Sequence, residues 1–325
     1  MFELITKLIP GLADSKAIVI IAMLVTFAGV IAMLKLFKSK LPTDLGRDFA
    51  FNGKLSAGKT RGAGIVFVCV FIVCSAIFIS ISPEYLIYYL LYFAGMLSGY
   101  LDDRSDKPWG EYKKGIIDLV ISLATAWTFV NFNPELTKLN LYFVEFNVIK
   151  PVFIVIGMLF VWAMINATNC SDGIDGLCGS LSINSLIAIF AVGLITKTDS
   201  TQLSTILLMI FAIFAYLWFN CEPSTMLMGD AGSRAIGLFL AVSVMKTGNI
   251  LLAIPVCFII LLDGLIGILK IVLIRFLKIN ALKKIRTPLH DHFRKNKSWS
   301  NTQVIYRFHI IQVLISALTI GLLYK

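Results

Sequence analysis

The chain of 325 residues is 58% hydrophobic and only 15% charged, with a mean hydropathy of +0.85. A soluble domain of this composition would expose more apolar surface than water tolerates, so the composition excludes a soluble globular protein. The apolar runs reach roughly 20 residues, which is the length of a bilayer-spanning helix and too long for the alternating strands of a barrel. We therefore predict an all-α integral membrane protein with one polytopic membrane domain over residues 1–325.

Ten apolar stretches are candidate membrane spans, and the eighth is unusually short. They cover residues 17–37, 63–82, 85–101, 116–132, 151–165, 177–195, 203–219, 235–245, 250–274 and 304–324. With the N-terminus outside, the loops at 35–62, 101–115, 166–176, 220–234 and 275–303 all lie on the inner side. These loops and the adjoining helix ends hold most of the 29 Lys and Arg, so the positive-inside rule makes their face cytoplasmic.

Two polar motifs flank the second and third predicted spans. The first is the glycine-rich basic stretch Gly58-Lys-Thr-Arg61-Gly-Ala-Gly64, and the second is the pair Asp102-Asp103. Neighbouring acids do not share a helix face, so the two aspartates should have different partners. At most one binds a metal, while the other holds a lysine or a substrate proton. An aspartate pair that only caps a helix explains the motif equally well.

A block of amides and acids follows the fifth predicted span. Asn166, Asn169, Asp172 and Asp175 recur at a spacing of three, which at a helix end lines them along one slowly drifting ridge. A glycine after each acid lets the backbone turn sharply. The block therefore predicts a surface that binds a polar ligand. The alternative is a helix terminus whose short polar side chains satisfy their own backbone.

The stretch Gly229-Asp230-Ala-Gly-Ser233 opens the eighth predicted span. Helix N-termini present free N–H groups and partial positive charge, which suit a phosphate. A nearby aspartate can carry a Mg²⁺ ion that the same phosphate shares, so we predict Asp230 as a metal ligand. A simple N-cap aspartate is the alternative.

The last motif, Pro288-Leu-His290-Asp-His292-Phe293, precedes the final span. In extended chain a spacing of two points both imidazoles the same way, which fits a diphosphate or a metal. Within the ninth span, Asp263 and Lys270 are seven residues apart and share a face. Buried charges need partners, so these two belong to the site, form a structural ion pair, or leave Lys270 to extend to the membrane surface.

These motifs resemble those of the polyprenyl-phosphate N-acetylhexosamine-1-phosphate transferases. The resemblance rests on residues 101–103, 166–177, 228–233 and 287–293, in the family's order over nearly the whole chain. The histidine motif is similar to the bacterial phospho-N-acetylmuramoyl-pentapeptide transferase branch of that superfamily. The ten-helix count and a cytoplasmic site agree with the same resemblance.

The resemblance implies transfer of phospho-MurNAc-pentapeptide from its UDP carrier to undecaprenyl phosphate, giving lipid I and UMP for peptidoglycan synthesis. It implies a bacterial inner or plasma membrane, with the site facing the cytoplasm. The expected partners are UDP-MurNAc-pentapeptide, undecaprenyl phosphate and membrane lipid, without nucleic acid. The expected cofactor is Mg²⁺, and a homodimer is allowed but not indicated.

The family's functional residues carry over onto matching positions of this chain. Asp102, Asp103 and Asp230 are implied to be catalytic, and Asp230 to bind Mg²⁺. The implied substrate-binding residues are Lys59, Arg61, Lys114, Asn166, Asn169, Asp172, Asp175, Ser233, His290 and His292.

The chain also departs from the family pattern. Leu227 stands where an aromatic residue is usual, Asp291 replaces the middle histidine, and Lys270 stands where glutamine is expected. The glycine-rich stretch leaves open which of Lys59 and Arg61 contacts substrate.

Two other functions remain open at this stage. A donor such as UDP-GlcNAc would serve another envelope polymer. An ion-coupled transporter would place its charges near the bilayer midplane and often shows repeated halves, and neither feature is seen in the sequence. The sequence also leaves open the oligomeric state, the peptide-stem preference, the base among Asp102 and Asp103, and the number of chemical steps.

Overall fold

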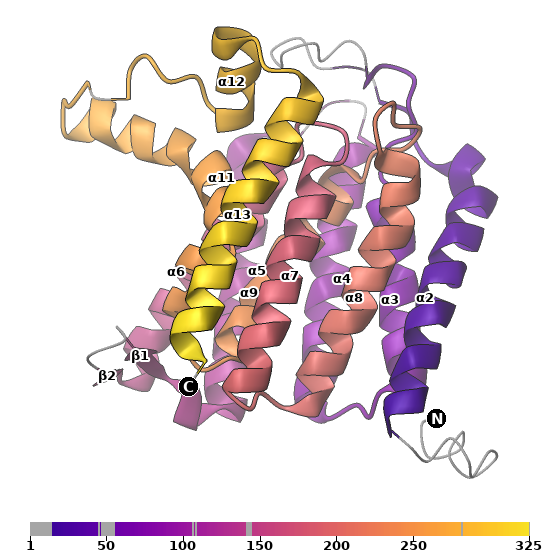
Figure 1. The fold of residues 1–325 in the computed structure, drawn as a ribbon, viewed down its shortest axis with the longest axis vertical. Coiled ribbons are helices and arrows are strands. Elements are labelled where there is room, and N and C mark those ends of the chain that lie inside the picture. The colour runs from indigo at the N-terminus through magenta and orange to yellow at the C-terminus, as the bar shows by residue number, and fades with distance from the viewer. Residues whose placement is uncertain are drawn as a thin grey trace.

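The computed structural model describes residues 15–44, 46, 56–105, 107, 109–140, 145–280 and 282–324. Most of these residues form helices that run side by side along the longest axis (Figure 1). The long helices are α2 (Ser15–Phe37), α3 (Gly64–Phe78), α4 (Pro83–Asp103), α5 (Glu111–Phe132), α6 (Lys150–Ser171), α7 (Leu177–Ile195), α8 (Ser200–Asn220), α9 (Gly229–Met245) and α13 (Asn301–Leu323).

Shorter elements complete the chain. They are α10 (Ala253–Val256), α11 (Phe258–Ile271), a π-helical turn (Val272–Phe276), α12 (Leu289–Lys297), and 3-10 turns at Lys38–Lys40, Pro134–Leu136 and Ile250–Leu252. One antiparallel pair, β1 (Lys138–Asn140) and β2 (Glu145–Asn147), lies between α5 and α6, with Leu139 opposite Phe146. The prediction of a helical protein is confirmed apart from this small hairpin.

Each predicted span contains a helix, but length and hydropathy identify fewer membrane crossings than predicted. Six helices are long and apolar enough to cross a membrane, and a seventh crossing follows if the bent pair after α9 counts as one. The prediction of ten crossings goes beyond this count. The described parts of the five loops predicted to share a face lie at one end of the bundle, because the helices from α2 to α9 alternate in direction and α13 begins at that same end (Figure 1).

Helix α9 lies at the centre of the bundle, and all of its residues are buried. It packs mainly against α4 and α6. Gly99 of α4 allows this contact, since a Cβ there would lie 2.3 Å from the carbonyl carbon of Asp230. Gly237 plays the same part against α6, where a Cβ would lie 2.7 Å from the Cα of Ile165. The helix starts at Gly229, six residues before the predicted span. The apolar pattern did not include this first part of the helix because its first turns are polar.

The first loop is attached to the start of α9 by backbone pairing. Thr60 forms bridges to both Thr43 and Met226. The Leu227 N–H donates to the Thr60 carbonyl at 2.7 Å, and the Ala63 N–H donates to the Leu227 carbonyl at 3.0 Å. The basic stretch before α3 is thereby held beside Gly229.

A buried polar cluster joins the helices at the opposite end of the bundle. The Lys246 Nζ lies 2.9 Å from Asn133 Oδ1, 3.1 Å from Asp199 Oδ2 and 3.2 Å from Glu84 Oε2. The Tyr85 hydroxyl donates to Asp199 at 2.8 Å. These contacts link α4, α5, α8 and the end of α9, and they satisfy a lysine that would otherwise be costly to bury.

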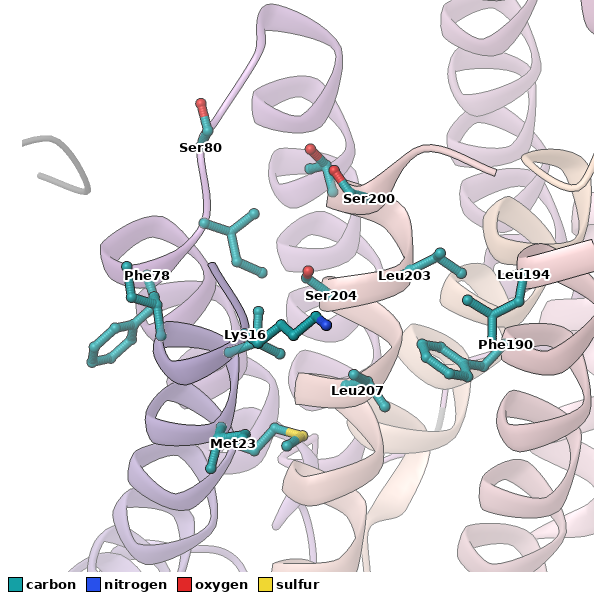
Figure 2. Close-up of a pocket in the computed structure, with 15 residues that line it drawn as sticks. Lys16, Met23, Phe78, Ser80, Phe190, Leu194, Ser200, Leu203, Ser204 and Leu207 are labelled. Atoms are coloured by element: carbon teal, nitrogen blue, oxygen red, sulfur yellow. The ribbon is translucent and has the colours of Figure 1, made fainter. Parts of the chain in front are cut away.

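An apolar pocket of about 590 Å³ also lies toward this opposite end, between α2, α3, α7 and α8 (Figure 2). Lys16, Met23, Phe78 and Leu203 are among its lining residues. None of the predicted site residues lines it. The predicted site residues therefore lie apart from this pocket, at the end where the motif loops gather.

The predicted ninth span is not one straight helix. The segments Ile250–Val256 and Phe258–Ile274 meet at an angle of 98° around Cys257, and α11 leaves the bundle sideways (Figure 1). Gln312 of α13 supplies the hydrogen bonds that the break removes. Its Oε1 accepts from the Ile259 N–H at 2.9 Å, and its Nε2 donates to the Pro255 and Val256 carbonyls at 3.0 Å. Because unpaired backbone groups are costly in a membrane, this one side chain makes the break tolerable.

We expect Gln312→Leu to destabilise the protein, because it leaves buried backbone groups on both sides of the break unpaired. Each such group costs roughly 1–3 kcal/mol. Thermal unfolding of detergent-solubilised protein measures the effect. Ser316→Ala is the matched control. Ser316 accepts from the same Gln312 amide at 2.9 Å but does not itself bind the backbone groups at the break. Equal unfolding temperatures for Gln312→Leu and Ser316→Ala would contradict this account.

Candidate active site

The Asp230 carboxylate, in the first turn of α9, is the centre of the motif cluster. Three cations surround it: Lys114 Nζ at 3.3 Å, Arg61 Nη2 at 3.5 Å and Arg234 Nη2 at 3.6 Å. Burial alone would raise the pKa of Asp230, but Lys114, Arg234 and Arg61 together lower it. Asp230 is therefore a buried carboxylate that stays ionised.

Asp103 connects the end of α4 to the start of α9. Its Oδ1 accepts from the Asp230 N–H at 3.1 Å, and its Oδ2 accepts from the Ala231 N–H at 3.2 Å. Its Oδ1 also lies 2.8 Å from Arg61 Nη2, and its side chain is fully buried. Gly229 makes room for the carboxylate, since a Cβ there would lie 2.1 Å from Oδ2. Two of the N–H groups predicted to be free for phosphate are thus occupied, because Asp103 caps the helix.

Burial and the charge of Asp230 raise the pKa of Asp103, whereas the charge of Arg61 lowers it. Burial is the larger effect, and with Asp230 it raises the pKa of Asp103 to about 6, against the lowering by Arg61. The two neighbouring carboxylates of this site, one from α4 and one from α9, therefore have pKa values shifted in opposite directions.

Asp102 has different partners, as its position next to Asp103 predicts. Its Oδ1 accepts from the Trp109 N–H at 2.7 Å, and its Oδ2 forms an ion pair with Lys114. Lys114 is therefore shared between Asp102 and Asp230, just as Arg61 is shared between Asp103 and Asp230. The three predicted catalytic aspartates form one chain linked by two cations.

The basic stretch before α3 divides its two cations. Arg61 reaches the aspartates and also Asp44, whose Oδ1 lies 3.3 Å from Arg61 Nη1. Lys59 instead lies 2.8 Å from Asp175 Oδ2. The Ser224 N–H donates to the same Asp175 oxygen at 3.1 Å. Sequence reasoning did not identify Asp44, which lies in a basic loop with no motif around it.

The amide and acid block does not form the single ridge that its spacing predicts. Helix α6 ends at Ser171, so Asp172 and Asp175 lie in the turn beyond it. Asn169 donates to Ser233 Oγ of α9 at 2.9 Å, whereas Asn166 donates to the Trp162 carbonyl of its own helix at 2.8 Å. Asn169, Ser233 and Asp175 thus join the cluster, while Asn166 makes its hydrogen bond within α6.

Asp172 contributes to the site through the effect of its charge on Arg61. It contributes, after Asp103, Asp230 and Asp44, to the field that raises the pKa of Arg61 against the opposing effect of burial. It therefore faces the same cation as the aspartates, from the α6–α7 turn.

The two predicted histidines diverge because they lie on helix α12 and not in extended chain. A spacing of two on a helix separates side chains by ~200°. The His290 N–H donates to Asp263 Oδ1 at 2.8 Å, and its Nδ1 lies 2.8 Å from Asp263 Oδ2. A Cβ at Gly173 would lie 2.2 Å from His290 Nε2, so that nitrogen faces the α6–α7 turn. The His292 Nδ1 instead accepts from the Arg286 N–H at 3.2 Å.

Asp263 and Lys270 do not form the ion pair that their spacing allows. Asp263 binds His290, and the Lys270 Nζ donates to the Ile285 carbonyl at 2.7 Å. Asp291, where the family carries a histidine, pairs with Arg294 at 3.3 Å. Asp263 is therefore the partner that orients His290.

Sequence reasoning also missed the pair behind Asp230. Arg234 Nη1 lies 3.0 Å from Asp118 Oδ1, and both side chains are only 3% exposed. The available signals were an arginine four residues after Asp230 on one helix face and an acid inside a predicted span.

The site carries more negative than positive charge. Four cationic side chains, Lys59, Arg61, Lys114 and Arg234, face seven carboxylates: Asp44, Asp102, Asp103, Asp118, Asp172, Asp175 and Asp230. Among the residues that the structure describes, no group of three His, Cys, Asp or Glu could hold a metal ion. Mg²⁺ is commonly held by one or two carboxylates with substrate phosphates completing its shell, and a site centred on Asp230 fits that arrangement.

We expect Asp103→Asn to destabilise the protein more than Asp102→Asn. Asparagine has one acceptor oxygen, so in Asp103→Asn one of the two capped N–H groups of α9 loses its partner, at a cost of roughly 1–3 kcal/mol. In Asp102→Asn the amide oxygen would still accept from the Trp109 N–H, and Lys114 would keep Asp230 as its partner. Thermal unfolding of both variants measures the difference, and an equal loss would show that Asp103 is not the cap of α9.

Known proteins resemble this chain over most of its length. The family described as glycosyl transferase family 4 matches residues 85–248. A phospho-N-acetylmuramoyl-pentapeptide-transferase of Treponema pallidum is 38% identical over 303 residues, covering 88% of this chain and 84% of that protein. Proteins of the same name from a Wolbachia of Brugia malayi and from Kosmotoga olearia are 28% and 27% identical, covering 74% and 81% of this chain and 77% and 83% of theirs. The chain therefore belongs to glycosyl transferase family 4.

Proposed function

We propose that the chain transfers phospho-MurNAc-pentapeptide from UDP-MurNAc-pentapeptide to undecaprenyl phosphate, forming lipid I and UMP. The observation that carries this proposal is the linked cluster of Asp102, Asp103 and Asp230 with their shared cations, in a chain whose relatives bear that enzyme's name. The apolar helices agree with a multi-pass bacterial membrane protein. The charge of the loops supports a cytoplasmic site.

The reaction exchanges one phosphorus–oxygen bond for another. An oxygen of undecaprenyl phosphate attacks the phosphorus that carries the sugar, and the bond from that phosphorus to the UMP oxygen breaks. UMP leaves with the electron pair. A phosphate monoester has a second pKa of about 6, so the acceptor is already largely anionic at neutral pH and needs little help from a base.

The protein's part is to bind and neutralise charge, as phosphoryl transfer generally requires. Arg61 and Lys114 are each 20% exposed and suited to meet substrate phosphates. Lys59 and His290 add cationic groups from the first loop and from α12. Mg²⁺ bound at Asp230 would supply further positive charge to the reacting diphosphate.

The donor is the first feature to test. Purified protein supplied with undecaprenyl phosphate and Mg²⁺ should release UMP from UDP-MurNAc-pentapeptide and not from UDP-GlcNAc. Release from UDP-GlcNAc alone would favour the alternative donor. Ion flux into proteoliposomes without UMP release would favour a transporter.

We expect Asp230→Asn to lower turnover by at least about a hundredfold, because the variant loses the charge at the centre of the cluster. The side chain makes no backbone hydrogen bond among the described residues, so the unfolding temperature should change little. Asp199→Asn, at the opposite end of the bundle, is the control and should keep turnover. Near-parental turnover with an unchanged Mg²⁺ requirement would remove Asp230 from the metal role.

We expect donor binding to weaken as pH rises, through His290. Burial opposes a charge on His290, but Asp263 outweighs it and raises the pKa above its ordinary value of about 6.5. The cationic form is therefore present below the raised pKa and is lost as pH rises through it.

The pH profile of KM for the donor measures this effect. Asp263→Asn should move the loss to lower pH, and His290→Ala should weaken donor use most at low pH, where the parent imidazole is cationic. His309→Gln in α13 is the control, since that ring contacts its own helix. A profile that is the same in the parent and in Asp263→Asn would show that His290 does not bind the donor as a cation.

A further inference from the structure

A buried ion pair lies directly behind Asp230. Arg234 Nη1 lies 3.0 Å from Asp118 Oδ1, and Arg234 Nη2 lies 3.6 Å from Asp230 Oδ2. Arg61 and Lys114 reach the same carboxylate from side chains that are 20% exposed, whereas Arg234 is 3% exposed. Asp230 therefore has two accessible cations in front of it and one fixed cation behind it.

The pair belongs to a ladder of alternating charge between α5 and α9. On α5, Lys114 precedes Asp118 by four residues, and on α9, Asp230 precedes Arg234 by four residues. Lys114 meets Asp230, and Asp118 meets Arg234. Residues four apart share a helix face, so one face of each helix presents two opposite charges to its partner.

Stability does not explain why an arginine occupies this position. A buried ion pair replaced by apolar residues of similar volume often leaves a protein equally or more stable. Arg234 Nε is buried and has no hydrogen-bond partner among the described residues, which adds a cost. What distinguishes the arginine is its second nitrogen, which faces Asp230.

We propose that Arg234, anchored by Asp118, is a positioning residue that keeps the Asp230 carboxylate oriented when substrate phosphates draw Arg61 and Lys114 away. The proposal rests on the proposed function, which brings phosphates to this site. The planar guanidinium suits the task, because one nitrogen binds the anchor while the other stays directed at Asp230.

The test replaces both members of the pair, since removing one would leave the other buried and unpaired. Asp118→Leu/Arg234→Leu should keep an unfolding temperature close to that of the parent. Its kcat should fall on the order of a hundredfold, as for a reacting group misplaced by about 1 Å, while KM for both substrates changes far less. Arg234→Lys, which keeps a cation beside Asp118, should recover part of the kcat.

The matched control is the buried pair at the other end of α9. Glu84→Gln/Lys246→Gln removes an ion pair of similar burial that joins the end of α9 to α4, whereas Asp118 and Arg234 join the start of α9 to α5. It should cost stability and keep the parental kcat. A double leucine variant with parental kcat would overturn the positioning role, and so would a control variant that loses kcat equally.

A binding measurement separates this proposal from the proposed function. Mn²⁺, used in place of Mg²⁺ with UMP and followed by electron paramagnetic resonance, should bind the double leucine variant at least about tenfold more weakly than the parent. Parent protein that binds Mn²⁺ and UMP but releases no UMP from the donor would overturn the proposed reaction alone. Equal Mn²⁺ affinity in parent and variant would overturn the positioning role alone.

Discussion

The two hydrogen bonds from the start of α9 to the Asp103 carboxylate are the contact on which the rest of the site depends. They fix the end of α4 against α9 and set the position of Asp230. The glycines at 99 and 229 make this contact possible, since a side chain at either would collide with it. Because Asp103 occupies two N–H groups of the helix terminus, the phosphates of the proposed reaction would have to bind the cations and not these backbone groups.

The two cations that face the site, Arg61 and Lys114, are each bound to more than one carboxylate. Arg61 pairs with three aspartates and Lys114 with two, and both side chains remain partly exposed. An incoming phosphate therefore competes for cations that are already bound to carboxylates. The cluster around Lys246 at the opposite end is built differently, since that lysine is itself buried. The proposed reaction lies at the end with shared, partly exposed cations, and the opposite end holds a buried cation surrounded by acceptors that joins the helices.

Much of this was predictable because it is local. Apolar length predicts the helical segments, and short runs such as Gly229-Asp230 predict the polar ends that gather at one end of the bundle. What was not predictable depends on contacts between distant segments. The break near Cys257 is tolerated because of Gln312, which lies in another helix. The direction of the histidines depends on whether residues after Pro288 form a helix, and the sequence pattern alone suits extended chain equally well.

The pair of Asp118 and Arg234 is another feature that the sequence alone could not predict. Each residue alone is a charge in an apolar helix, which predicts a partner but does not say which one. Only the packing of α5 against α9 shows that the partners are each other and that the arginine continues to Asp230. The matching four-residue spacings on the two helices are visible in the sequence, but they gain meaning only when the helices are known to be neighbours. In a membrane helix bundle, charge spacing thus predicts that a polar contact exists, and helix packing decides whether that contact serves structure or chemistry.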